Sequence, residues 1–167
     1  MGAPVRYRVF VDVGAADGYY AVGLLFSGRV ERSVAFETIP EYRAAIAQLA
    51  NKNGVADKIT ILGTASGRFA DVLVKNQITS RETMFLIDIE GAEFELLTKE
   101  VFTALSDSLI VVETHAHIYA DLQGEMNRLI EKASATHSVT AWYPGAQSVD
   151  DQRTRQFYRD RSVDSLF

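Results

Sequence analysis

The sequence predicts an α/β protein with a doubly wound, mostly parallel β-sheet. Short apolar segments rich in β-branched residues alternate along the chain with helix-like stretches of about ten to fifteen residues, the pattern of repeated β-α-β units. The apolar segments show little alternation of polar and apolar residues, as expected of strands that helices cover on both faces. A length of 167 residues without a repeat or linker predicts a single domain, residues 1–167.

Three strand–helix units are predicted in the first half of the chain. Gly14 ends the first strand, and Pro40 and Gly54 bound the second helix, because proline fits the first turn of a helix and glycine terminates it. The predicted strands cover residues 8–13, 33–37 and 58–63, and the predicted helices cover residues 19–28, 41–54 and 69–76.

Two further units and a last strand are predicted in the second half. Strands are expected at residues 85–90, 109–115 and 137–143, and helices at residues 91–105 and 119–135. The apolar stripe of the first of these helices consists of Phe94, Leu97, Val101 and Leu105. The segment 150–161 is densely charged, and a short terminal strand is expected at 163–167.

Composition argues against several functional classes. Seventeen basic against 22 acidic residues give a formal charge of −5, the wrong sign for a protein that follows a phosphate backbone, so we expect no nucleic-acid partner. The absence of cysteine excludes disulfides, thiolate zinc sites and a cysteine nucleophile. Apolar stretches are shorter than the roughly 18 residues that span a bilayer, and the amino terminus lacks a signal-peptide core. We therefore expect a cytoplasmic protein with no membrane partner.

The first strand runs into a glycine-containing loop, VDVGAADG at residues 11–18. Ligands of open α/β sheets bind beyond the carboxyl ends of the strands, and Gly14 and Gly18 would let the backbone approach a cofactor there. The two glycines stand four positions apart, which does not fit the spacing of a dinucleotide fingerprint. Asp12 and Asp17 add negative charge, which favours a ligand with ammonium or hydroxyl groups over a phosphate. A plain turn without a ligand is the alternative.

An acidic residue, Glu37, closes the second predicted strand and is followed by Thr38. A carboxylate at this position can accept hydrogen bonds from both ribose hydroxyls of an adenosine. Together with the first loop, Glu37 predicts an adenosine-containing cofactor. A solvated glutamate at a strand end is the alternative.

Two carboxylates follow the fourth apolar segment in LIDIEGAE, residues 86–93. In a strand that extends to residue 90, Asp88 and Glu90 point to the same side. Like charges held close together need compensation from a metal, a cation or a shared proton. In the alternative, Glu90 caps the following helix and Asp88 accepts hydrogen bonds from backbone amides.

A glutamate and two histidines follow the fifth apolar segment in VVETHAH, residues 111–117. Glu113 and His115 are expected on one face at the end of a strand that neighbours the fourth. An imidazole there can act as a general base near neutral pH or bind a metal, and His117 is spaced to join it. Hydrogen-bonded histidines with a purely structural role are the alternative.

These segments together resemble the FkbM-type family of S-adenosylmethionine-dependent methyltransferases. The resemblance rests on VDVGAADGYYA, AFETIPEY, NGVADKITIL with the Ala-Ser pair that follows, FLIDIEGAEFELL and VVETH, and it covers roughly residues 9–115. It implies the class I methyltransferase fold, Rossmann-like, with strand order 3-2-1-4-5-7-6 and the last strand antiparallel. The final strand of this chain looks short or incomplete against that pattern.

The resemblance also implies roles for individual residues. Asp12, Gly14 and Gly18 would surround the methionine moiety, Glu37 would bind the ribose, and the stretch from Thr64 to Ser66 would lie beside the adenine. The implied cofactor-binding set is Asp12, Gly14, Ala16, Asp17, Gly18, Glu37, Thr38, Ala65, Ser66 and Asp88. Ala16 departs from the family, which commonly has asparagine there, so one hydrogen-bonding side chain is missing.

The implied reaction is methyl transfer from S-adenosylmethionine, leaving S-adenosylhomocysteine, to a hydroxyl group of a small metabolite or sugar. We expect His115 to take the proton of the acceptor, with Asp88 or Glu113 orienting the imidazole or the acceptor. These residues together with Glu90 could instead hold a divalent cation, but no second metal-binding pattern supports one. The sequence also leaves open a nicotinamide-dependent oxidoreductase and a non-catalytic adenosine-binding module.

Overall fold

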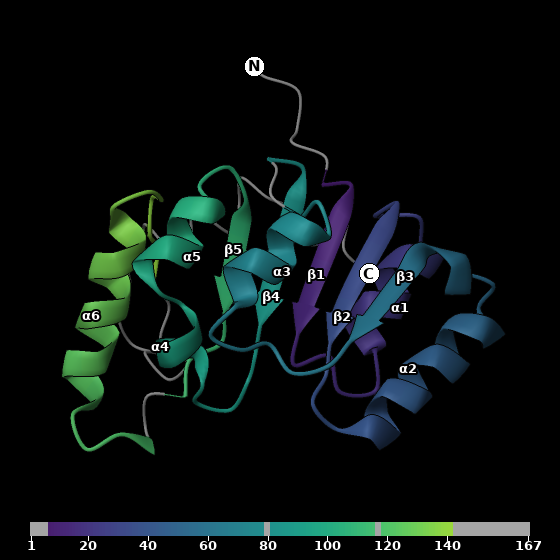
Figure 1. Cartoon of the computed structure of the whole chain (residues 1–167), viewed down its shortest axis with the longest axis horizontal. Coiled ribbons are helices and arrows are strands. Elements are labelled where there is room, and N and C mark those ends of the chain that lie inside the picture. Colours follow the sequence, from purple (N-terminus) through teal and green to yellow (C-terminus); the bar gives the residue numbers. More distant parts are fainter. Residues whose placement is uncertain (1–6, 79–80, 116–117, 142–167) are drawn as a thin grey trace, which may run out of the picture.

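The computed structural model describes residues 7–78, 81–115 and 118–141. Five parallel strands form one sheet in the order β3-β2-β1-β4-β5 (Figure 1). The strands are β1 Val9–Val13, β2 Arg32–Phe36, β3 Ile59–Leu62, β4 Thr83–Ile87 and β5 Leu109–Val112. The α/β class is confirmed, and the order agrees with the first five positions of the order that the resemblance implies.

Helices cover both faces of the sheet (Figure 1). They are α1 Tyr19–Phe26, α2 Pro40–Lys52, the 3-10 helix η1 Ala56–Lys58, α3 Phe69–Lys75, α4 Glu93–Leu96, α5 Lys99–Ala104 and α6 Leu122–Ser134. Because side chains alternate along a strand, Val11 and Val13 pack with α3, α4, α5 and α6, whereas Phe10 packs with α1 and α2. No helix in the described ranges is both long and apolar enough to cross a membrane.

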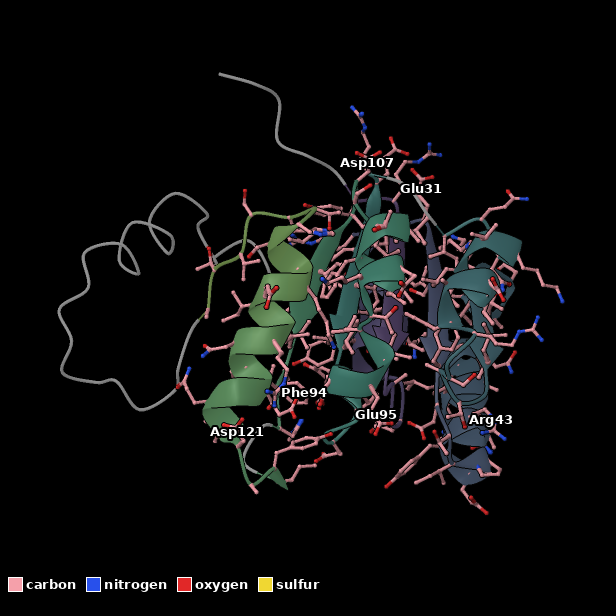
Figure 2. All side chains as sticks on the ribbon, turned by 60° about the vertical axis from the view of Figure 1, so that its left-hand side comes forward. Glu31, Arg43, Phe94, Glu95, Asp107 and Asp121 are labelled. Carbon is pink, nitrogen blue, oxygen red and sulfur yellow. The ribbon has the colours of Figure 1, made fainter. Side chains whose placement is uncertain are left out.

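The register of the sheet brings the carboxyl ends of the strands to one edge. Val13 pairs with Phe36 of β2 and with Ile87 of β4, and Ile87 pairs with Val112 of β5. Figure 2 shows this edge from the side: Arg43, Phe94 and Glu95 of the helices that follow β2 and β4 lie at one end, and Glu31 and Asp107 lie at the opposite end. The loops that carry the predicted site residues therefore meet at a common edge.

The predicted helix at 91–105 is wrong as a continuous element. The chain forms α4 and α5 instead, because Leu97 leaves the helical conformation (ψ 77°) and Thr98 is extended (ψ 168°). The side chain of Thr98 accepts a hydrogen bond from the backbone N–H of Val101 at 3.3 Å, as an N-cap does. Thr98 therefore interrupts the predicted helix, and its hydroxyl caps the start of α5.

The fourth and fifth strands end earlier than predicted, at Ile87 and Val112 rather than at residues 90 and 115. Glu90 and Gly91 both have positive φ angles, 55° and 107°, which turn the chain away from the β-ladder. Asp88 and Glu90 therefore lie in a loop and not on one face of a strand.

The predicted strand at 137–143 is wrong for its described part, residues 137–141, which form no strand. The ring of His137 contacts the Thr136 hydroxyl at 2.8 Å and the Leu105 carbonyl oxygen at 3.1 Å, so this segment is tied to the end of α5. Residues 142–143, the charged segment 150–161 and the expected terminal strand 163–167 lie outside the described residues.

Candidate functional site

The loop between β1 and α1 folds tightly against the end of β4. Gly14 has a φ angle of 91°, and a Cβ atom at this position would overlap the backbone carbonyl oxygen of Asp88. Gly18, with a φ of 89°, precedes α1 and lies against the side chain of Ile46. Both glycines are therefore required by the fold of the loop, as well as by the predicted approach of a cofactor.

The carboxylate of Glu37 ties this loop to the end of β2. Its two oxygens accept hydrogen bonds from the backbone N–H groups of Ala16 and Ile39, each at 2.8 Å. Ala16 itself has a φ of 46°, a left-handed conformation that asparagine adopts more readily than alanine. Glu37 is 8% exposed, and each oxygen of a carboxylate can accept a further hydrogen bond, so its role toward a ribose is compatible with these contacts.

Asp12 is buried beneath the same loop. Its Oδ2 atom has no hydrogen-bond partner within the described part of the chain. Burial raises the pKa of Asp12 to about 7; the negative charges of Asp88 and Glu37 add to the increase, and a hydrogen bond with the backbone of Ala21 opposes it. Asp12, Glu37 and Asp88 therefore lie within electrostatic reach of one another.

A second cluster joins the loops after β4 and β5. His115 Nε2 lies 3.8 Å from Asp88 Oδ1 and 3.5 Å from Glu90 Oε2. The structure thus brings Asp88, Glu90 and His115 together as expected, although through loops and not through strand faces. Burial and the negative charge of Glu113, an exposed residue at the end of β5, raise the pKa of Asp88.

Glu93 completes this cluster, although it was not among the predicted site residues. It is fully buried at the start of α4, and its Oε1 atom lies 2.9 Å from His115 Nδ1. The same oxygen accepts hydrogen bonds from the backbone N–H groups of Ile89 and Gly91. One signal was present: Glu93 precedes Leu97 and Val101 by four and eight positions, which places it on the apolar stripe of the predicted helix.

Six carboxylates that the structure describes lie at the carboxyl edge, and the guanidinium of Arg43 there donates hydrogen bonds to the backbone carbonyls of Glu37 and Thr38. Among the described residues, none of these carboxylates forms an ion pair with a lysine or arginine. The carboxylates are those of Asp12, Glu37, Asp88, Glu90, Glu93 and Glu113. Such a site favours a cationic ligand. One ligand atom from each of Asp88, Glu90 and His115 lies within 4.8 Å of the others, so these residues could also hold a metal ion.

The remaining predicted residues have local contacts at or near this edge. The Asp17 carboxylate accepts a hydrogen bond from the Tyr19 N–H at the start of α1, and the Thr38 carbonyl accepts one from Arg43. Ala65 packs against the core, and the Ser66 carbonyl accepts the Phe69 N–H that opens α3. His117 lies outside the described residues.

A cavity of about 410 Å³ lies beside this edge and not within it. It is bounded by β5, α5, α6 and residues 136–141, and its lining includes Phe102, Leu109 and Leu129. None of the predicted site residues lines it.

No protein-family model and no curated protein matches the chain. Several solved structures resemble it, among them three of comparable similarity. A precorrin-6y C5,15-methyltransferase from Geobacter metallireducens is 19% identical, with a TM-score of 0.50 over 76% of this chain and 62% of that chain. The spermidine synthase from Thermotoga maritima is 20% identical, with a TM-score of 0.52 over 81% of this chain and 46% of that chain. The mitomycin 7-O-methyltransferase MmcR is 19% identical, with a TM-score of 0.51 over 79% of this chain and 44% of that chain.

The chain therefore has the Rossmann-like fold of class I methyltransferases, and identities of 18–20% to such structures establish the fold alone. It spans about half of the length of the solved structures it resembles, between 44% and 62% for these three. None of these similarities is specific to the FkbM-type family.

The burial of Asp12 predicts a pH-dependent stability. Its pKa is near 3.8 in the unfolded chain and about 7 in the folded one, so the folded state binds the extra proton and its advantage disappears as the pH rises through about 7. The wild type should lose up to about 4 kcal/mol of unfolding free energy from this group between pH 4 and 8. Asp12→Asn should lack this loss.

Urea denaturation of both proteins across this pH range measures the difference. We expect the unfolding free energy of the variant, relative to that of the wild type, to increase steadily with pH, so that the variant is the more stable protein at pH 8. Parallel curves for the two proteins would show that Asp12 ionises in the folded state as it does in water.

Proposed function

We propose that the protein is an S-adenosylmethionine-dependent methyltransferase of the FkbM type that transfers a methyl group to a hydroxyl of a small molecule. The observation that carries the proposal is the acidic carboxyl edge of a class I methyltransferase fold, where Glu37 and the glycine loop meet without a lysine or arginine ion pair in the described part of the chain. The resemblance of the sequence motifs to the FkbM-type family supports the same assignment.

The residues present suit this cofactor chemically. Its sulfonium and ammonium groups carry positive charge. The buried Asp12 and the half-buried Asp88 each have a carboxylate oxygen without a hydrogen-bond partner within the described ranges. Glu37 would accept the ribose hydroxyls, and the segment from Thr64 to Ser66 would border the adenine. A pyrophosphate would instead lie close to Asp12, in a loop whose two glycines do not have the dinucleotide spacing.

When bound, S-adenosylmethionine would supply a methyl group to an acceptor oxygen, and its positively charged sulfur would leave with the electron pair of the broken S–C bond. The chain then has two tasks, to orient the acceptor and to receive its proton. His115 lies beside Asp88, which follows the strand next to the cofactor loop, so its imidazole can receive that proton while Asp88 holds the acceptor.

The choice of oxygen as the acceptor atom rests on the family resemblance. The solved structures of similar fold include a protein named as a C5,15-methyltransferase and one named as a 7-O-methyltransferase, so the fold leaves the acceptor atom open. The spermidine synthase shows that the fold also serves other reactions. A screen of hydroxyl, amine and carbon acceptors tests the assignment, and transfer confined to nitrogen or carbon would overturn it.

Replacing Glu37 tests the cofactor site. Glu37→Ala should weaken the binding of S-adenosylhomocysteine by about 1–3 kcal/mol, because charge-assisted hydrogen bonds to the ribose are lost. Glu41→Ala removes an exposed carboxylate from the first turn of α2 and should bind as the wild type does.

Because Glu37 also holds the backbone of Ala16 and Ile39, each variant needs a thermal unfolding curve, and affinity is compared only below the transition. Unchanged affinity in a folded Glu37→Ala protein would refute the ribose assignment.

Replacing His115 tests the route of the proton. His115→Ala should lower the methyl-transfer rate about a hundredfold while the affinity for S-adenosylhomocysteine stays close to that of the wild type, because a general base acts in the transition state. A chelator should leave the wild-type rate unchanged. Normal activity of the variant would rule out the base, and loss with a chelator that magnesium restores would assign Asp88, Glu90 and His115 to a metal instead.

A further inference from the structure

Glu93 is fully buried, which is rare for a glutamate. It has no exposed surface at the start of α4, and Oε1 receives three hydrogen-bonding groups: the N–H of Ile89 at 3.2 Å, the N–H of Gly91 at 3.1 Å and His115 Nδ1 at 2.9 Å. Its Oε2 has no partner within the described part of the chain. Oε1 therefore acts as a hydrogen-bond acceptor toward its three neighbours.

The loop that surrounds Glu93 is held in place from outside. Gly91 has a φ of 107° and lies against Ile118, and its carbonyl oxygen accepts a hydrogen bond from the Tyr119 hydroxyl at 2.8 Å. The ring of Tyr119 packs edge-on against Phe94, the residue after Glu93. These contacts fix the direction in which the carboxylate of Glu93 meets the imidazole.

The contact with Glu93 determines which nitrogen of His115 carries a proton. Glu93 Oε1 already accepts hydrogen bonds from two backbone N–H groups, so it meets the ring as an acceptor and Nδ1 must donate. The lone pair of the neutral ring then lies on Nε2. Nε2 is the atom that faces Asp88 and Glu90 at the carboxyl edge. The ring is therefore oriented with its basic nitrogen toward the proposed acceptor site.

We infer that Glu93 is the positioning residue for His115, fixing the Nδ1–H tautomer so that Nε2 takes the proton of the acceptor hydroxyl as its oxygen bonds to the methyl carbon. This inference rests on the function proposed above. Glu93 does not touch the acceptor in this arrangement, and its effect passes through the imidazole. Within the described residues three acidic groups face His115, namely Glu93 at Nδ1 and Asp88 and Glu90 at Nε2, and all raise its pKa, Glu93 most strongly.

The first test needs no enzymatic activity. NMR of isotope-labelled histidine, with the His115 signals assigned from a His115→Asn variant, reports the tautomer and the pKa of the ring. We expect the Nδ1–H tautomer and a raised pKa in the wild type, and a lower pKa in Glu93→Gln. An Nε2–H tautomer in the wild type, or an unchanged pKa in the variant, would overturn the inference even if methyl transfer is observed.

The second test separates positioning from a structural role. Glu93→Gln should lower kcat at least tenfold with KM for the acceptor nearly unchanged, and in a His115→Ala background it should cause no further loss. Glu95→Gln, a matched change at an exposed position of α4, should leave kcat unchanged. An equal loss in both backgrounds would show that Glu93 only supports the loop.

Failure to fold and failure of the proposed function give different results. If Glu93→Gln fails to fold, the wild-type tautomer decides the question alone, and Glu93→Asp replaces it in the kinetic comparison. If no acceptor is methylated although the NMR result is as expected, the proposed function fails while the link between Glu93 and His115 stands.

Discussion

Negative charge gathered at the carboxyl edge of a parallel sheet is the constraint on which this structure depends. The register of β1, β2, β4 and β5 brings their ends level, so the acidic residues in or after the last residues of these strands meet at one edge. In the described residues these carboxylates form no ion pair with lysine or arginine, and burial raises the pKa of Asp12 and Asp88. Backbone N–H groups and one histidine contact some of their oxygens, while Asp12, Asp88 and Glu93 each keep one oxygen without a hydrogen-bond partner in the described residues. This leaves an edge suited to a cation.

The carboxyl edge consists of the loop after β1 and the loops after β4 and β5, and these parts meet where Gly14 packs against Asp88. Glu37 and Ala16 fix the loop that would hold the nucleoside, and Glu93 fixes the imidazole on the other side. Gly14 packs directly against the backbone of Asp88, so any larger residue at position 14 would separate these parts. Asp88 thus belongs to both, which fits its proposed place between cofactor and acceptor.

Much of this arrangement was predictable from the sequence, and the failures have physical causes. The five described strands were found because buried parallel strands are continuous apolar runs, as in the segment around Val11. The ends of β4 and β5 were set too late because apolar and acidic residues continue past Ile87, while the turn depends on the positive φ of Glu90 and Gly91. The burial of Glu93 could be suspected from its place on the apolar stripe of the predicted helix, but its contact with His115 depends on the folding of the loops after β4 and β5, which periodicity does not reveal.

Calorimetric titration of the wild-type protein with S-adenosylhomocysteine and, separately, with NAD tests the role of the acidic edge most directly. An acidic edge built for a nucleoside without phosphate should bind S-adenosylhomocysteine with one molecule per chain and show no heat of binding with NAD. Binding of NAD in place of S-adenosylhomocysteine would contradict this role, because its pyrophosphate would then lie beside Asp12 in an acidic loop that should repel it.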